Sequence, residues 1–433
     1  MTFWVILAIS IYLFFRLKNT KFFHLIRYSL LIFVTCFLII HIIRYPQQSF
    51  EAAKAGINTW FYIVFPALLP FFIGSELLIG LGVIEFIGTL LEPIIRPIFK
   101  VPGEGSFIFV MSITSGYPVG VKLTTQLRNQ NRLTKTEGQR LLSFCSTSGP
   151  LFIIGAVAVG MFHNPQLGFV LSVAHYLSAL TTGLIFRFYG SDQQIPLRQN
   201  FSVKHIKKAF QKMFQTFQNS GSFSYLFSAS VKHSVETLLF LGGFIIFFSV
   251  ISEILSFIGL IDFIASSVSR PLSFLEIPPE AFQAIIKGAL EMTIGCQSLS
   301  EIPSVSFIQQ AVLACMIISW SGFSIHAQAA GFISKTDLSI GMYIFSKLLH
   351  AIFSGIWVLL IIPLSYIVFE NSQAVFFHML TSQPFLPAWT EKIIFSSQLF
   401  CMSTITFIAI ALLSQIILVC CAWVAKCKNK IFY

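Results

Sequence analysis

The stretch SELLIGLGVIEFIG at residues 75–88 recurs 177 positions later as SEILSFIGLIDFIA at residues 252–265. The two copies share an opening Ser-Glu pair and a glycine at the same place, Gly82 in the first and Gly259 in the second. Further matches follow in the same order, while the offset shortens from 177 to 172 residues. Such a long repeat indicates that the fold consists of two copies of one structural unit.

The chain around these copies is too apolar for a water-soluble core. Of its 433 residues 55% are apolar and only 10% are charged, whereas an average soluble domain is about 25% charged. The apolar residues also occur in long runs, as in membrane-spanning helices. Composition therefore predicts an all-α integral membrane protein, and it excludes a secreted disulfide scaffold, a nucleic-acid-binding domain and a soluble enzyme.

The apolar runs predict about nine transmembrane helices. They cover residues 3–15, 28–43, 57–81, 141–162, 167–186, 235–255, 307–331, 340–368 and 394–424. Two amphipathic segments, 83–99 and 260–274, are expected to be interfacial helices. Two more, 106–124 and 281–299, are apolar but interrupted by polar or helix-breaking residues, so we expect two re-entrant hairpins.

These segments define the predicted domains. Two N-terminal transmembrane helices (1–45) precede the first repeat (46–188), a basic cytoplasmic linker (189–234), the second repeat (235–369), and a last transmembrane helix with a basic tail (370–433). Lysines at 204, 207, 208 and 212 suggest that the linker touches anionic lipid in the bilayer.

Charge gives the expected orientation, because basic residues concentrate on the cytoplasmic side of a membrane. An external N-terminus and a cytoplasmic C-terminus place all but five of the 28 Lys and Arg residues inside. The first spans of the two units then run in opposite directions, so the repeats are inverted. Inverted repeats with broken helices are typical of carriers that work by alternating access, and a duplication without transport is the alternative.

The first interrupted segment combines helix breakers with hydroxyls and one cation. Because Pro118 lacks a backbone donor and two glycines loosen the chain, we expect a turn whose free N–H groups favour an anion. Lys122 would add a full charge, or it extends to the cytoplasmic surface instead. The candidates here are Ser115, Gly116, Tyr117 and Lys122 for binding, and Pro118 and Gly120 for gating.

The second interrupted segment holds an acid and a base four residues apart. In a continuous helix Lys287 and Glu291 would face each other, either as a structural ion pair or as a gate or proton-sensitive site. The candidates are Glu291, Thr293 and Gln297 for binding, and Lys287 and Gly295 for gating.

Two predicted spans also carry polar clusters. In one span, hydroxyls precede the Gly-Pro pair at 149–150 and either bond to carbonyls freed by the break or bind a solute. In the other span, His326 can titrate near neutrality, or it is a structural core residue. The binding candidates are Ser146, Thr147, Ser148, Ser321, His326 and Gln328, and the gating candidates are Gly149 and Pro150. His175 and Lys347 occupy equivalent positions in the last span of each unit, where we expect them to serve packing between helices.

Other chemistry is not indicated. The eight cysteines form no CxxC pair and lie mostly in apolar runs, so they are interpreted as small buried residues, and no metal or cofactor is expected. The motifs GxxxxGK[ST], HExxH and GxSxG do not occur, so nucleotide-driven transport and the common hydrolase chemistries lack support. The sequence predicts that the protein is not an enzyme.

Three stretches carry a family resemblance. They are SGYPVG at 115–120 followed by Lys122, STSGPLF at 146–152 with GAVAVGMF at 155–162, and the segment from Gly288 to Gln297. Residues 45–370 thereby resemble the YlbJ-type sporulation integral membrane proteins of endospore-forming bacteria. That family belongs to the broader nucleoside recognition, or gate-domain, group, which is similar in layout to concentrative nucleoside carriers.

The resemblance implies passage of dipicolinate (pyridine-2,6-dicarboxylate) out of the mother-cell cytoplasm across the outer forespore membrane. On this interpretation, helix-terminal N–H groups and Lys122 hold the carboxylates, and Tyr117 stacks on the ring. The sequence leaves open whether calcium accompanies the dianion and whether the chain forms a homo-oligomer. A nucleoside-like small-solute carrier and a non-transporting scaffold for spore envelope or cortex assembly are the alternatives.

Overall fold

The computed structural model describes residues 21–190 and 203–372, and within these ranges the regular secondary structure is helical throughout. The predicted spans 3–15 and 394–424 lie outside the described residues, as does part of the linker. Five helical segments are long and apolar enough to cross a membrane: Pro46–Gly80, Pro165–Phe186, Phe223–Phe257, Phe307–Ile333 and Ile340–Pro363. Each coincides with a predicted span, which confirms the all-α membrane fold.

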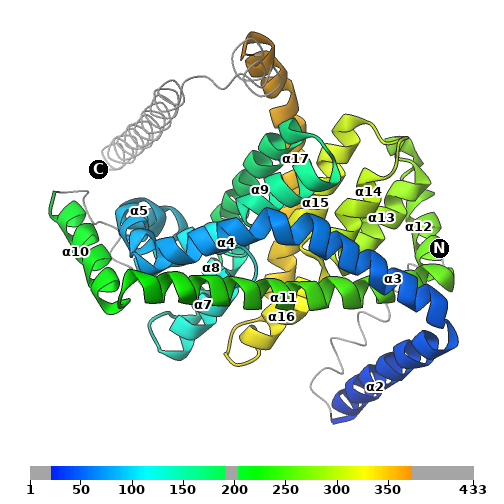
Figure 1. Ribbon diagram of the computed structural model, residues 1–433, viewed down its shortest axis with the longest axis horizontal. Coiled ribbons are helices and arrows are strands. Elements are labelled where there is room, and N and C mark those ends of the chain that lie inside the picture. Colours follow the sequence, from blue (N-terminus) through cyan, green and yellow to red (C-terminus); the bar gives the residue numbers. More distant parts are fainter. Residues whose placement is uncertain (1–20, 191–202, 373–433) are drawn as a thin grey trace, which may run out of the picture. The chain divides into compact units, whose positions relative to one another are not determined.

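The helices occur in the order that the repeat predicts (Figure 1). After α2 (Lys21–Arg44), the first repeat contains α3 (Pro46–Asn58), the π-helix η1 (Thr59–Val64), α4 (Phe65–Gly80), α5 (Val83–Phe99), α6 (Glu104–Ser115), α7 (Val119–Asn129), α8 (Lys135–Phe144), the π-helix η2 (Phe152–Met161) and α9 (Pro165–Phe186). Helix α10 (Val203–Asn219) follows. The second repeat contains α11 (Phe223–Phe257), α12 (Leu260–Ser269), the 3-10 turn η3 (Ser273–Leu275), α13 (Pro279–Leu290), α14 (Met292–Ser300), α15 (Phe307–Trp320), α16 (Gly322–Ile333) and α17 (Ile340–Ser372).

Backbone conformation is alike at two corresponding places of the predicted repeats. Gly82, before α5, has a φ of 76°, and Gly259, before α12, has a φ of 74°. The residues that follow the next helical segment, Lys100 and Glu276, also match, with φ values of 51° and 53°. Left-handed backbone at both pairs means that the two units turn the chain at the same places, and at the first place glycine adopts it without strain.

The first helices of the two repeats run antiparallel. Ser249 of α11 donates a hydrogen bond to the carbonyl of Ala52 (2.9 Å), and the indole of Trp60 donates to the carbonyl of Leu238 (2.9 Å). Residue numbers therefore fall along α11 as they rise along α3 and η1, and Figure 1 shows α11 running beside α3 and α4.

The last helices of the two repeats also contact each other. The indole of Trp357 donates to the Thr181 hydroxyl (3.0 Å), and Nε2 of His350 lies 3.0 Å from the carbonyl oxygen of His175. The antiparallel first helices agree with opposite directions of the two units, and the inversion of the whole repeats stays a prediction.

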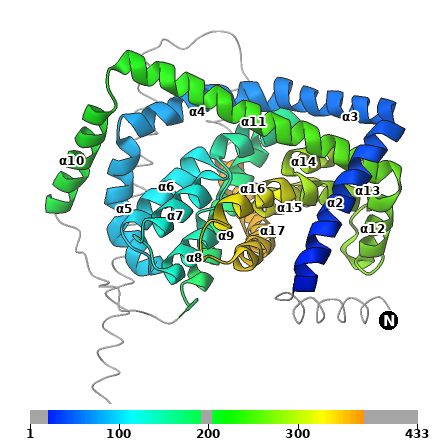
Figure 2. The same ribbon diagram turned by 90° about the horizontal axis from the view of Figure 1, so that it is seen from below.

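The linker departs from its predicted bounds. Helix α11 begins at Phe223 rather than near residue 235, because the Ser222 hydroxyl accepts a hydrogen bond from the N–H of Tyr225 and caps the helix. Lys232 and His233 do not end the helix, since both side chains are exposed on its surface. Much of the predicted linker is therefore helical, and α10 packs beside α5 (Figure 2).

Candidate functional site

Four helix interruptions lie close together in pairs. The turn between α6 and α7 lies against the break between α8 and η2, since a Cβ atom built on Gly116 would come 2.8 Å from the backbone nitrogen of Gly149. The break between α13 and α14 lies against the one between α15 and α16, since a Cβ atom built on Gly322 would come 3.0 Å from Cα of Glu291. Each re-entrant hairpin thus meets the broken span of its own repeat at the interruption.

A small, partly open cavity lies between the two pairs. Its volume is about 40 Å³, and Met292 and Ile325 of the second repeat contribute to its wall. The first repeat supplies the polar part of the lining, namely Ser115, Gly116, Tyr117, Ser148 and Gly149. Such a volume has room for ordered water but is far below the roughly 300 Å³ of a small-molecule pocket. The structure therefore represents a closed conformation at this site.

Beside the cavity lies a buried lysine that connects the two repeats. Lys347 of α17 has no exposed surface, and its ammonium donates to the hydroxyl of Tyr117 (3.0 Å) and the carbonyl of Ser146 (2.8 Å). Its third neighbour is Nδ1 of His350, at 3.1 Å. Tyr117 and Ser146 belong to the two interruptions of the first repeat, so Lys347 joins them to the last helix of the second.

The hydrogen-bond partners assign the protons in this cluster. Because Nε2 of His350 faces the His175 carbonyl, which can only accept, that nitrogen carries the proton and Nδ1 accepts from Lys347. Tyr117 donates its own proton to the carbonyl of Ile318 (3.1 Å) and accepts from Lys347. All three partners of Lys347 are acceptors, as a protonated ammonium requires, and the ammonium also lies 4.7 Å from the centre of the Tyr117 ring.

His175 holds the break of the first repeat in the same way. Its Nε2 accepts from the backbone N–H of Ser148 (3.0 Å), so its Nδ1 donates to the hydroxyl of Ser319 (2.8 Å). Tyr176 donates to the carbonyl of Ser148 (2.9 Å). Backbone groups freed by the interruption are therefore bonded to side chains of α9 and, through Lys347, of α17, because polar backbone at membrane depth needs partners.

The first repeat provides most of the predicted binding residues that meet here. Ser115, Gly116, Tyr117 and Ser148 line the cavity, and Ser146 bonds to Lys347 and lies 3.2 Å from the Tyr343 hydroxyl. Thr147 instead donates to the carbonyl of Ser112 (3.0 Å) and supports the hairpin. Pro118 begins α7, and Gly149 and Pro150 precede η2, at the predicted breaks.

The second hairpin differs from its prediction. Helix α13 ends at Leu290 and Glu291 has an extended backbone, so Lys287 and Glu291 do not share a helix face, and no ion pair joins them within the described residues. The buried Glu291 carboxylate instead accepts from the N–H of Ile294 (2.9 Å) and the hydroxyl of Thr293 (3.1 Å), which caps α14.

Three predicted residues lie away from the central cavity. Lys122 is exposed on α7, the position that the alternative interpretation gave it. Lys287 and Gln297 line a separate cavity of about 460 Å³ together with Glu253 and Glu301, and Gln297 donates to Glu301 (2.7 Å).

The break between α15 and α16 carries the last three candidates. Ser321 has left-handed backbone and bonds to the carbonyl of Trp320. His326 is buried with its ring centre 4.4 Å from that of Trp320 and 5.6 Å from that of Tyr343, and neither ring nitrogen has a hydrogen-bond partner. Nε2 of Gln328 also lacks one.

The sequence interpretation missed the centre of this cluster. His175 and Lys347 were expected to serve packing alone, and His350 and Tyr343 were not singled out, yet these residues join the interruptions. A sequence signal existed, because a charged residue within an apolar transmembrane helix indicates a functional site.

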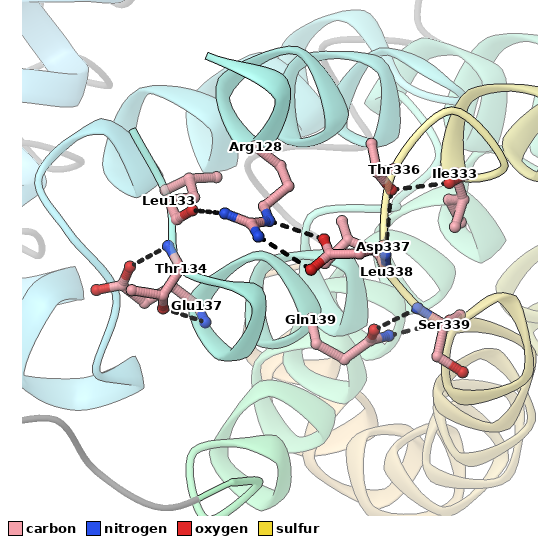
Figure 3. Close-up of polar contacts among 10 residues, drawn as sticks. All are labelled: Arg128, Leu133, Thr134, Glu137, Gln139, Ile333, Thr336, Asp337, Leu338 and Ser339. Atoms are coloured by element: carbon pink, nitrogen blue, oxygen red, sulfur yellow. Dashed lines mark hydrogen bonds and ion pairs between the residues drawn. The ribbon is translucent and has the colours of Figure 1, made fainter. Parts of the chain in front are cut away.

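One end of the molecule is closed by polar contacts across the two repeats (Figure 3). The Arg128 guanidinium donates to both carboxylate oxygens of Asp337 (2.8 and 2.9 Å) and to the carbonyl of Leu133 (2.8 Å). Gln139 and Ser339 exchange two hydrogen bonds, of 3.2 and 2.9 Å. We call Arg128, Leu133, Asp337, Gln139 and Ser339 the polar clamp. They join the end of α7 and the middle of α8 to the loop after α16.

Long apolar helices and two sets of interrupted helices that meet in the interior define the chain as an integral membrane protein with a transporter-like layout. Residues 61–191 match the family model described as "Gate: Nucleoside recognition". The chain is 40% identical over 349 residues to the "Sporulation integral membrane protein YlbJ" of Bacillus subtilis (strain 168), covering 80% of this chain and 85% of that protein. The chain therefore belongs to the YlbJ family of sporulation integral membrane proteins.

A second relative is more distant. An uncharacterized protein of Alkalihalophilus pseudofirmus is 29% identical over 145 residues, which cover 32% of this chain and 29% of that protein. No solved structure matches the fold. Neither the matching family model nor the Bacillus subtilis relative is named as an enzyme.

Proposed function

We propose that the protein is a carrier that moves dipicolinate out of the mother-cell cytoplasm across the outer forespore membrane by alternating access. The observation that carries the proposal is the meeting of four helix interruptions, two from each repeat, around one small cavity. Irregular backbone at membrane depth is tolerated where it lines a protein or water-filled space. In transporters, such places are where solutes bind.

The chemistry of the site favours an anion. In the first repeat and on α17 its polar groups are hydroxyls, imidazoles and the Lys347 ammonium. The Glu291 carboxylate at the break of the second repeat is bonded to Ile294 and Thr293, and no carboxylate forms an ion pair with Lys347 in the described part of the chain. Dipicolinate is a rigid aromatic dianion, and Tyr117 offers a ring at the cavity wall. The name of the Bacillus subtilis relative supports a role in sporulation.

The two ends of the molecule fit one closed step of a transport cycle. The polar clamp closes the end of α16 that leads into α17, whereas the cavity of about 460 Å³ lies beside Glu301, before α15 begins. The broken span α15–α16 therefore has the polar clamp after its C-terminal end and the cavity of about 460 Å³ near its N-terminal end. On this proposal the clamp faces the cytoplasm, with the N-terminus outside and the C-terminus inside, and transport involves no catalytic step.

A nucleoside-like solute is the second candidate, because the matching family model describes nucleoside recognition. Purified protein in vesicles loaded with terbium would report dipicolinate flux by luminescence, with uridine as competitor and protein-free vesicles as control. We expect flux that uridine does not reduce. Radiolabelled uridine flux without dipicolinate flux would favour the second candidate, and absence of both from folded protein would favour a scaffold for envelope assembly.

A further inference from the structure

We propose that Lys347 binds a carboxylate of the transported solute, and that binding replaces the hydrogen bond by which Lys347 holds Tyr117. This inference rests on the proposed function, and it names the group that recognises the anion. It also places that group on α17, outside the hairpins and broken spans where the sequence placed every candidate.

Charge and burial single out Lys347. It has no exposed surface, and its three partners are a phenol, a carbonyl and an imidazole, none of which carries a negative charge in the assigned proton arrangement. A buried charge is stable only when it is paired, and hydrogen bonds to neutral acceptors satisfy geometry without supplying a counter-charge. An anion at this position would supply it.

Other cations near the hairpins are exposed, share a cavity with carboxylates, or lie away from the interruptions. Lys122 is exposed to the surroundings, and Lys287 shares its cavity with the carboxylates of Glu253 and Glu301. The buried Arg140 donates to the carbonyls of Tyr189 and Lys100, at the ends of α9 and α5. Of these four cations, Lys347 is the one that lies at the interruptions.

Geometry links anion binding to movement of the first hairpin. All three N–H groups of Lys347 are in use, so a carboxylate must displace an existing acceptor. Tyr117 is the acceptor that also lines the cavity, and its own proton is donated to Ile318 of α15. Displacing Tyr117 therefore frees the turn between α6 and α7 from both α15 and α17.

The first test compares Lys347→Met with Lys232→Met in purified protein. Both remove an ammonium from a long apolar helix, but Lys232 is exposed and lies far along α11. We expect Lys347→Met to weaken equilibrium binding of dipicolinate at least tenfold and Lys232→Met to change it less than twofold. Lys122→Met is measured alongside: a tenfold loss there with unchanged binding in Lys347→Met would overturn the inference.

Ligand chemistry provides a second, fold-independent readout. Picolinate carries a carboxylate where picolinamide carries a neutral amide. The ratio of their affinities therefore reports recognition of the negative charge. We expect wild-type protein to prefer picolinate at least tenfold and Lys347→Met to lose that preference; a preserved preference contradicts the inference.

Tyr117→Phe keeps the ring and the lysine but removes the displaced hydroxyl. We expect tighter binding of dipicolinate in this variant, and weaker or unchanged binding contradicts displacement of Tyr117. If wild-type protein binds carboxylates through Lys347 but transports no dipicolinate, the proposed function fails and this inference stands. If wild-type protein transports dipicolinate and Lys347→Met does so with unchanged KM, the inference fails alone.

Discussion

Gly120 and Gly295 show how single residues keep the hairpins closed. A Cβ atom built on Gly120 would come 1.7 Å from the carbonyl oxygen of Cys145, and one built on Gly295 would come 2.2 Å from Cα of Gly288. In both cases the neighbouring atom belongs to backbone, which cannot rotate away. The sequence identified these equivalent glycines as structural or gating residues, and the structure supplies the reason, which is close approach of two backbone segments.

We expect Gly120→Ala to lower the free energy of unfolding by about 2 kcal/mol or more, because overpacking against backbone forces a shift of the helices. Gly74→Ala is the matched control, since no atom lies within 4 Å of a Cβ built there. It should change stability by less than about 1 kcal/mol, in the stabilising direction that helix propensity predicts. Thermal unfolding in detergent measures both, and equal losses would refute the packing argument.

Helix α10 packs on α5 and leaves aromatic and basic side chains exposed. One face packs on α5: Nε2 of His205 lies 2.6 Å from the carbonyl oxygen of Thr89, and the Phe86 and Phe210 rings are 4.7 Å apart. Phe214 and Phe217 remain exposed, and Lys207, Lys208 and Lys212 are exposed as well. Exposed aromatic and basic stripes on one helix are typical of a segment that lies in the membrane interface.

We therefore expect α10 to insert its aromatic stripe into bilayers that contain anionic lipid. A tryptophan placed by Phe214→Trp should be quenched by brominated lipids beyond the wild-type signal, whereas one placed by Gln211→Trp should not. The effect should shrink when Lys207, Lys208 and Lys212 are all changed to Gln, because juxtamembrane basic residues contribute about 1 kcal/mol each near an anionic surface. Equal quenching at positions 211 and 214 would exclude this orientation.

Local sequence patterns predicted the elements better than the contacts between them. Pro118 and Pro150 indicated the breaks of the first repeat, since proline lacks the N–H that a helical hydrogen bond needs. An interruption was also expected within residues 281–299, but no proline marks its position at Glu291, where the backbone packs against Gly322. A prediction from spacing alone therefore placed Lys287 and Glu291 on one face.

At the scale of the whole molecule, the sequence predicted the inversion but not the residues that join the halves. Charge distribution gave opposite directions for the two units, and the antiparallel first helices agree with that prediction. Lys347 reaches Tyr117 across 230 positions and Ser146 across 201. Local sequence patterns do not predict contacts between residues so far apart in the chain. These contacts are found only in the folded structure.

The polar clamp provides a test of how the halves separate. Loss of the Arg128–Asp337 pair should raise the reactivity of the buried Cys145, because that thiol lies at a break which opens when the repeats part. Both partners are partly exposed, so the pair contributes about 1 kcal/mol or less, and Asp337→Ala should accelerate labelling by up to about fivefold. Arg132→Ala is the control, since Arg132 pairs with Glu104 inside the first repeat.

The pH dependence has a defined sign. Hydrogen bonds from Arg128 hold the pKa of Asp337 below its usual range, so the stabilisation is complete above a pH of about 4, the ordinary pKa of the group. It is lost as pH falls through the lowered pKa. Labelling of Cys145, followed by peptide mass spectrometry and corrected for thiolate content, should thus be constant from pH 5 to pH 8 in wild-type protein.

The exchanged pair Arg128→Asp with Asp337→Arg should restore slow labelling; fast labelling in that variant, or in Arg132→Ala, would show that the clamp does not hold the repeats together.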